Sequence, residues 1–162
     1  MAGGLFAAWA VHDAEELFTM GSTSRALAAA APEWLPVPPD IRRDGYSPAH
    51  FRVALAVMAA VTAAAAADGI RTQGRSPFFR AGLDAFGWHG VGHVAAALAL
   101  RRYVSGVATS PVVVVGYWLW ARRALARDGA PMVGTGLRSA LLVTPVLLVA
   151  PGVARALTRG GR

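Results

Sequence analysis

The chain of 162 residues contains no cysteine and no lysine, and only 15% of its residues are charged. The absence of cysteine excludes a disulfide framework and a zinc site held by thiolates. A soluble domain usually carries about 25% charged residues, so this low charge is typical of a chain that lies in a bilayer. Because 55% of the residues are hydrophobic, the chain also has too much apolar surface to remain disordered in water.

The positive charge of the chain does not indicate a nucleic-acid partner. The formal net charge is +7, and all 16 basic residues are arginines. Nucleic-acid-binding proteins gather such cations on one face, among polar residues. Here the arginines lie between apolar segments, as in the pairs Arg42 and Arg43 or Arg101 and Arg102. Cations flank membrane spans in this way, so we expect no nucleic-acid partner.

Mostly apolar segments follow one another along the whole chain. A membrane-spanning helix needs about 20 such residues. The segments that approach or reach this length are residues 3–20, 48–67, 82–100, 111–126 and 137–157. The sequence therefore predicts an all-α, polytopic membrane bundle of about five transmembrane helices in the cell membrane, with residues 1–162 forming a single domain.

Local signals refine the predicted helix boundaries. Ser47 and Ser110 each precede a proline, which predicts two helix starts with a serine cap and proline at the first helical position. Two prolines in the segment 137–157 predict a kink. Residues 21–46 are rich in proline, so we expect an interfacial loop there, with a short surface helix at residues 25–31.

The first apolar segment contains ionisable residues at its centre: His12, Asp13, Glu15 and Glu16. An ionisable residue inside a membrane span costs about 2.5 kcal/mol or more, so it indicates a functional site. Residues three and four positions apart share a face of a helix. His12, Glu15 and Glu16 therefore project together, while Asp13 is turned roughly 100° away.

The third apolar segment contains a pair of histidines, His89 and His93, one helical turn apart. This spacing allows both imidazoles to reach one metal ion. Gly90 and Gly92 let a neighbouring helix approach closely. The first and third segments cross in the same direction, and His12 and His93 lie roughly 10–12 Å from the same surface. We therefore expect one site that combines His12, Glu15, Glu16, His89 and His93.

Three imidazoles and two carboxylates suit a divalent metal, either Zn or Fe. In a zinc site, the three histidines would be ligands together with Glu15 or Glu16, and the other glutamate would act as a general base. A dinuclear iron site would use both glutamates, although such helical sites usually contain four glutamates and two histidines. The sequence therefore favours one metal ion in an enzyme that acts on a lipophilic small molecule, by hydrolysis, isomerisation or oxidation.

Two other functions are consistent with the same residues. A buried carboxylic acid with a histidine relay could protonate an alkene, epoxide or enol without a metal, as an isomerase or cyclase does. Alternatively, the polar cluster could hold helices together or pass protons in a non-catalytic binding, transport or partner subunit. The partners expected across these alternatives are the lipid bilayer, a lipophilic small molecule, and either a membrane partner protein or a second copy.

Two further residues are candidates for accessory roles. His50, one turn inside the second apolar segment, is expected to be an outer ligand or proton shuttle, or else an interfacial histidine near Tyr46 and Phe51. Asp84, one turn before Trp88, is expected to lie near the opposite surface. It is also a candidate for a supporting contact with one of the metal ligands.

The order of these features resembles a known family, the HXXEE-domain proteins, which are small bacterial integral-membrane proteins. The resemblance covers nearly the whole chain, and it implies a membrane bundle with a polar site at the motif but no particular reaction. Ser105 departs from the family pattern, in which a proline is expected before the glycine. The resemblance is carried by His12 to Glu16, Trp34, Phe51, the pair His89 and His93, and the stretch from Arg102 to Thr109.

Overall fold

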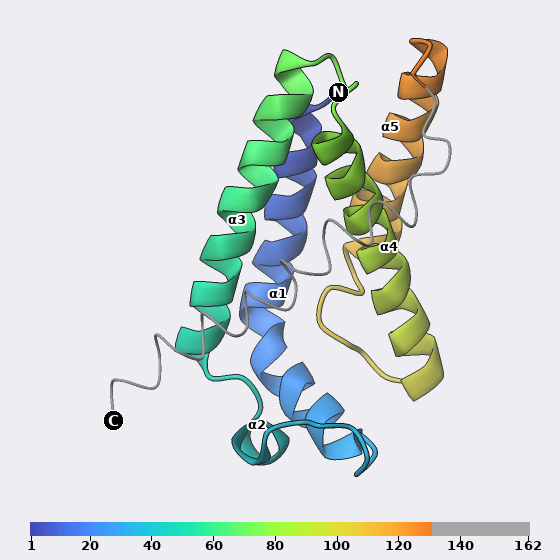
Figure 1. Ribbon diagram of the computed structural model, residues 1–162. Helices are drawn as coiled ribbons and strands as arrows, with labels where there is room; N and C mark the ends of the chain where they lie inside the picture. Colours follow the sequence, from blue (N-terminus) through green and yellow to red (C-terminus); the bar gives the residue numbers. More distant parts are fainter. Residues whose placement is uncertain (131–162) are drawn as a thin grey trace.

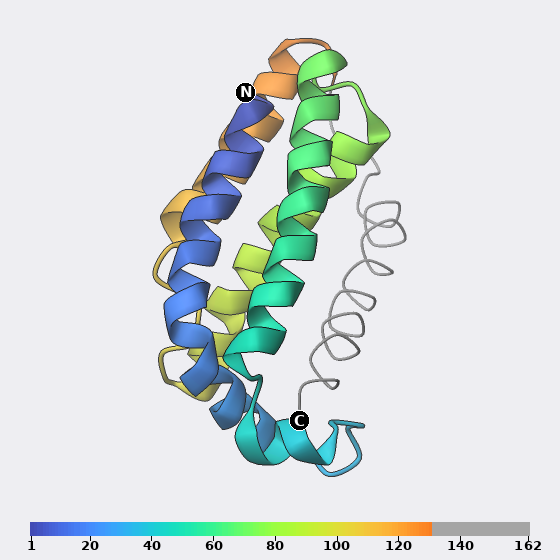
Figure 2. The same cartoon turned by 90° about the vertical axis from the view of Figure 1, so that its left-hand side faces the viewer.

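The structure is a computed structural model that describes residues 1–130, and within this range the chain forms helices and no strand. Helices α1, α3, α4 and α5 lie lengthwise in a bundle, and the short α2 lies at one end (Figures 1 and 2). The predicted all-α fold is confirmed for these residues, and the predicted segment 137–157 lies outside them. The elements are α1 (Gly3–Ala30), α2 (Pro39–Asp44), α3 (Pro48–Arg71), α4 (Pro77–Leu100), the π-helix η1 (Ser110–Val115) and α5 (Gly116–Arg127).

One of the two predicted serine caps is confirmed. The hydroxyl of Ser47 accepts a hydrogen bond from the backbone N–H of His50 at 3.1 Å, and α3 begins at Pro48. The prediction for Ser110 is wrong, because its hydroxyl donates to the backbone oxygen of Gly106 at 2.6 Å. The chain enters the π-helix η1 at this point and then continues directly into α5.

α1 is longer than the sequence predicted. It continues through residues 21–30, where we expected a loop with a separate helix at residues 25–31. Tertiary hydrogen bonds explain the extension: Thr19 and Thr23 bind Ser105, and Ser24 accepts from the backbone N–H of Tyr46 at 3.1 Å. Most helical stability in proteins comes from such tertiary contacts, which outweigh the weak helix propensity of the polar residues.

Packing in the bundle places α1 against α3 and η1, and α4 against α3, η1 and α5. Gly90 allows the close approach that we expected, because a Cβ atom there would lie 2.6 Å from Val114 of η1. Within residues 1–130, no atom lies within 4 Å of a Cβ atom placed at Gly92, so the described helices do not show the close approach expected there. The fully buried side chains that form the core are Leu5, Phe79, Leu83, Val114 and Leu125.

Within the described part of the chain, α3 alone is long and apolar enough to cross a membrane. Only 17% of its most apolar stretch is buried against the rest of the protein. α1 carries ionisable residues at its centre, and α5 contains only 12 residues. The multi-pass bundle predicted from the sequence is therefore not established by the described helices.

The connection between α4 and η1, residues 101–109, brings the chain back toward the middle of the bundle (Figures 1 and 2). It leaves α4 through a left-handed turn at Arg101, whose φ is 49°. Val104 and Ser105 are almost completely buried, at 2% and 1% exposure. The loop therefore packs into the protein and forms one side of the site described next.

Candidate metal centre

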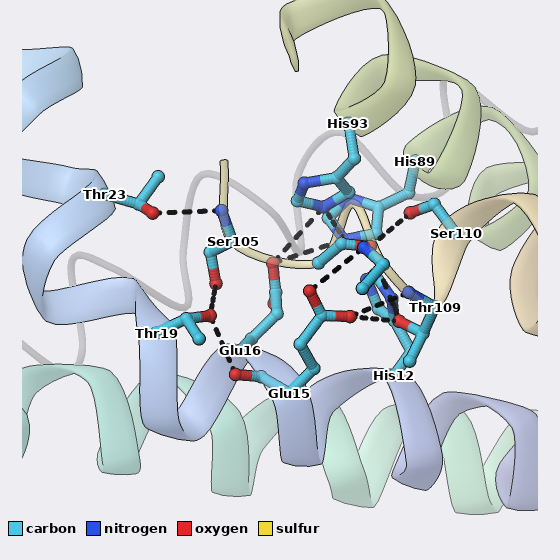
Figure 3. Close-up of polar contacts among 12 residues, drawn as sticks. His12, Glu15, Glu16, Thr19, Thr23, His89, His93, Ser105, Thr109 and Ser110 are labelled. Carbon is cyan, nitrogen blue, oxygen red and sulfur yellow. Dashed lines mark hydrogen bonds and ion pairs between the residues drawn. The ribbon is translucent and has the colours of Figure 1, made fainter. Parts of the chain in front are cut away.

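Four of the predicted site residues come together between α1 and α4 (Figure 3). His12 and Glu16 lie one turn apart on α1, and His89 and His93 lie one turn apart on α4. One potential ligand atom from each of these residues lies within 4.8 Å of the other three. Among the described residues, the structure thus contains a group whose donor atoms are suited to one metal ion.

The distances within the group are short. Nε2 of His93 lies 3.2 Å from Oε1 of Glu16 and 2.8 Å from Nε2 of His89. The ring of His12 is edge-on to both other histidines, with centroid distances of 5.2 Å to His89 and 5.1 Å to His93. Ligand atoms around a tetrahedral zinc are about 3.3 Å apart, so small side-chain movements would suffice to close the site around an ion.

Two buried atoms of the group lack a hydrogen-bond partner within the described residues. They are Nε2 of His12 and Oε1 of Glu16, on side chains that are 0% and 6% exposed respectively. Oε1 lies 3.2 Å from Nε2 of His93, which forms an ion pair with it only when that imidazole is protonated. Buried polar atoms are almost always hydrogen-bonded in native proteins, and each exception requires an explanation. A metal ion would provide one, because Nε2 of His12 and Oε1 of Glu16 would both hold it through their free lone pairs. The residues present therefore fit a metal ion.

Glu15 has different partners from Glu16. Its carboxylate accepts hydrogen bonds from the hydroxyl of Tyr103, from the backbone N–H of Ala108 at 3.1 Å, and from both the N–H and the hydroxyl of Thr109 at 2.8 and 2.7 Å. All four groups are donors, so they stabilise the ionised carboxylate. Partial burial and the bond to Glu15 also raise the pKa of Tyr103, which keeps this phenol a donor. The structure thus places Glu15 against the loop rather than in the group of ligand atoms.

The hydroxyl of Thr109 also connects Glu15 to His12. It lies 2.8 Å from Nδ1 of His12 and 2.7 Å from Oε2 of Glu15. A hydroxyl has one proton, and the carboxylate can only accept, so Thr109 donates to Glu15 and accepts from His12. His12 therefore carries its proton on Nδ1, and Nε2 presents a lone pair to the other ligands. Such supporting hydrogen bonds fix the tautomer and orientation of metal-binding histidines.

Gly106 packs directly against the histidines. Its φ is +82°, and a Cβ atom there would lie 2.7 Å from Cε1 of His12 and 3.0 Å from Cε1 of His93. Reasoning from residue spacing missed the roles of Gly106 and Thr109 in this loop. The stretch that carries the family resemblance, Arg102 to Thr109, was the available signal for them.

The two accessory candidates lie elsewhere. His50 is buried and stacks on Tyr46 with a centroid distance of 4.9 Å. This contact agrees with its expected role as a histidine near Tyr46 rather than as an outer ligand. Asp84 is 1% exposed and accepts hydrogen bonds from Trp118 at 2.9 Å and from Arg122 at 2.5 Å. Its carboxylate therefore links α4 to α5.

An apolar cavity of about 190 Å³ adjoins the group of ligand atoms, between α1, α3 and α4. Glu16 and His89 line one part of its wall, and the side chain of His89 is 46% exposed. Asp13, which was expected to project away from Glu16, lines the same cavity. The remaining wall is formed mainly by apolar side chains, among them Trp9, Phe51 and Met58. The site is thus open to an apolar molecule on this side.

The comparisons with known proteins agree with the resemblance seen in the sequence. Neither the curated proteins nor the solved structures contain a match to the chain. Residues 4–121 match the model of the family described as proteins of unknown function with an HXXEE motif, and this range contains every ligand of the candidate centre. The chain belongs to the HXXEE family.

Proposed function

We propose that the protein is an integral membrane enzyme that holds one divalent metal ion, Zn or Fe, at His12, Glu16, His89 and His93, and acts on a lipophilic small molecule. The observation that carries the proposal is the group of four ligand atoms within 4.8 Å, of which Nε2 of His12 and Oε1 of Glu16 are buried and lack a hydrogen-bond partner among the described residues. A protein without cysteine must bind such a metal through imidazole and carboxylate groups.

In the proposed chemistry, one set of residues holds the metal ion and a second set positions those ligands. When bound, Zn or Fe supplies Lewis-acid polarisation of a substrate oxygen, and Fe also supplies oxidation chemistry. Glu15 and Thr109 orient His12, and Gly106 keeps the loop close to the histidines. With Glu15 occupied by four donors, one carboxylate remains in the group, which favours a single ion over a dinuclear centre.

A membrane location is supported by the outer surface of the described helices. Phe18 of α1, Leu98 of α4 and Val112 of η1 are 86%, 73% and 78% exposed, so large apolar side chains face outward on three elements. The apolar stretch of α3 is likewise mostly exposed. Large exposed apolar surfaces are rare on soluble monomers and are typical of contact with lipid. The apolar cavity next to the ligands supports a lipophilic substrate.

Metal analysis of the protein, purified in lipid nanodiscs, tests the proposal. We expect about one Zn or Fe per chain, and loss of the ion in His93→Ala. His50→Ala is the matched control, because His50 is also a buried histidine but stacks on Tyr46 outside the group of ligand atoms. Less than about a tenth of an equivalent, unchanged after incubation with either metal, would contradict the metal site and favour metal-free acid–base chemistry.

A further inference from the structure

The cavity between α1, α3 and α4 contains a second carboxyl group that the proposed metal site does not use. Asp13 is 7% exposed and lines the cavity beside Glu16 and His89. Its surroundings desolvate the carboxyl group, and no hydrogen bond to it is found within residues 1–130. A buried carboxyl group without a partner is unfavourable, so its position on the wall of a cavity indicates that a ligand supplies the partner.

The other groups on the wall restrict the polar end of that ligand. Among the described residues that line the cavity there is no arginine, and apart from Asp13, Glu16 and His89 the polar groups are the hydroxyl of Thr62, on α3, and the indole N–H of Trp9, on α1. Without a metal ion, a carboxylate-ended molecule such as a fatty acid would meet two carboxyl groups and no cation. With the ion bound, the carboxylate would bind the metal and leave Asp13 without a donor. An ammonium group would be repelled by a metal ion at Glu16 and His89. A hydroxyl group avoids both conflicts, since it is uncharged and can donate and accept at once.

We infer that the cavity binds an apolar alcohol, with the hydroxyl group at Asp13 and the apolar part along the α3 wall. The hydroxyl donates to the carboxyl group of Asp13 and directs its oxygen toward the side of His89 and Glu16. The volume of about 190 Å³ suits a single ring or a short chain, because an engineered apolar cavity of about 150 Å³ in another protein holds benzene. This inference rests on the proposed function, which supplies the metal ion that disfavours an ammonium group.

The test uses four probes of one shape: para-fluorobenzyl alcohol, para-fluorobenzylamine, para-fluorobenzoate and para-fluorotoluene. Their binding to the full chain in nanodiscs is measured by fluorine NMR, with and without metal. We expect the alcohol to bind about tenfold more tightly than fluorotoluene, which corresponds to one hydrogen bond. It should also bind more tightly than the amine in the metal-loaded protein and more tightly than the benzoate in the metal-free protein. Asp13→Leu should reduce the preference for the alcohol over fluorotoluene several-fold, because leucine has a similar size but no hydrogen-bonding group.

Two control variants show whether the probes bind in this cavity. Ala54→Phe fills the cavity from α3 and should abolish binding of every probe, whereas Thr62→Val removes the one hydroxyl group among the described lining residues and should preserve the preference for the alcohol. The inference is overturned if Ala54→Phe has no effect, if Asp13→Leu keeps the full preference, or if Thr62→Val removes it. It is also overturned if no probe binds, as occupation of the cavity by another part of the chain or by a second copy would cause.

The metal content of the same samples separates this inference from the proposed function. A metal-free protein that still prefers the alcohol through Asp13 contradicts the metal site and supports the cavity assignment. A protein that binds metal but shows no preference dependent on Asp13 contradicts the cavity assignment alone.

Discussion

The hydroxyl oxygen of Thr109 lies 2.8 Å from Nδ1 of His12, although the two residues are 97 positions apart in the chain. Because the same hydroxyl donates to Glu15, this contact determines which nitrogen of His12 is available to a metal ion. The motif residue Glu15 therefore acts on the site through Thr109, while Glu16 reaches the site directly. In the proposed metal site, the HXXEE motif thus contributes two candidate ligands, His12 and Glu16, and one residue, Glu15, that positions His12.

Thr109→Val should weaken metal binding roughly 10–100-fold, as is typical when a supporting hydrogen bond to a metal ligand is lost. Valine has the shape of threonine but cannot accept from Nδ1 of His12. Thr109→Ser, which keeps the hydroxyl, should retain most of the affinity. Competition with a chelator measures both affinities, and equal affinities for the two variants would contradict the positioning role of the hydroxyl.

Gly106→Ala should destabilise the protein by about 1–3 kcal/mol, because the backbone has a positive φ and the new methyl group would press on His12 and His93. Gly92→Ala is the matched control. Gly92 lies inside α4, and a Cβ atom placed there meets no atom of the described residues within 4 Å, so alanine should stabilise the helix by about 1 kcal/mol. Thermal unfolding measures both changes, and a similar loss in the two variants would contradict the packing at Gly106.

The four candidate ligands were predictable because helical periodicity acts over short distances in the sequence. The spacing of His12 and Glu16, and of His89 and His93, places each pair on one helix face, and the matching depths brought the two pairs together. The position of Glu15 was not predictable from periodicity, because it depends on where the loop of residues 101–109 folds. The same loop binds Thr19 and Thr23, which is why the end of α1 was also misplaced.

The two glutamates of the motif should respond differently to replacement by glutamine. Glu16→Gln should reduce metal content and leave the fold intact, since its carboxylate belongs to the group of ligand atoms. Glu15→Gln should lower stability by about 1–2 kcal/mol, because one amide oxygen cannot accept from four donors in this partly exposed position. Metal content and unfolding temperature, measured on both variants, check this contrast, and identical behaviour of the two would contradict it.

Asp84→Asn should destabilise the packing of α4 on α5 without changing metal content. The asparagine can still accept from Trp118, but Arg122 loses its charge partner. We expect a loss of about 1–3 kcal/mol, below the cost of about 3–5 kcal/mol for a fully buried pair, because the side chain of Arg122 is 34% exposed. Unfolding and metal analysis of the same variant check both parts, and loss of metal would place Asp84 among the residues that support the centre.

The absence of native cysteine permits a direct test of the membrane location through single-cysteine variants. Ala60 lies in the middle of α3 and is exposed in the structure, and Arg75 is exposed in the turn between α3 and α4. In a bilayer, Ala60→Cys should resist a water-soluble maleimide, because lipid covers the position, whereas Arg75→Cys should react readily from its own side of the membrane. In detergent-free soluble protein, both cysteines would react alike. Labelling of intact and opened membrane vesicles distinguishes these outcomes. Rapid labelling of Ala60→Cys in intact vesicles would contradict an α3 span, because only lipid would protect this exposed position from water.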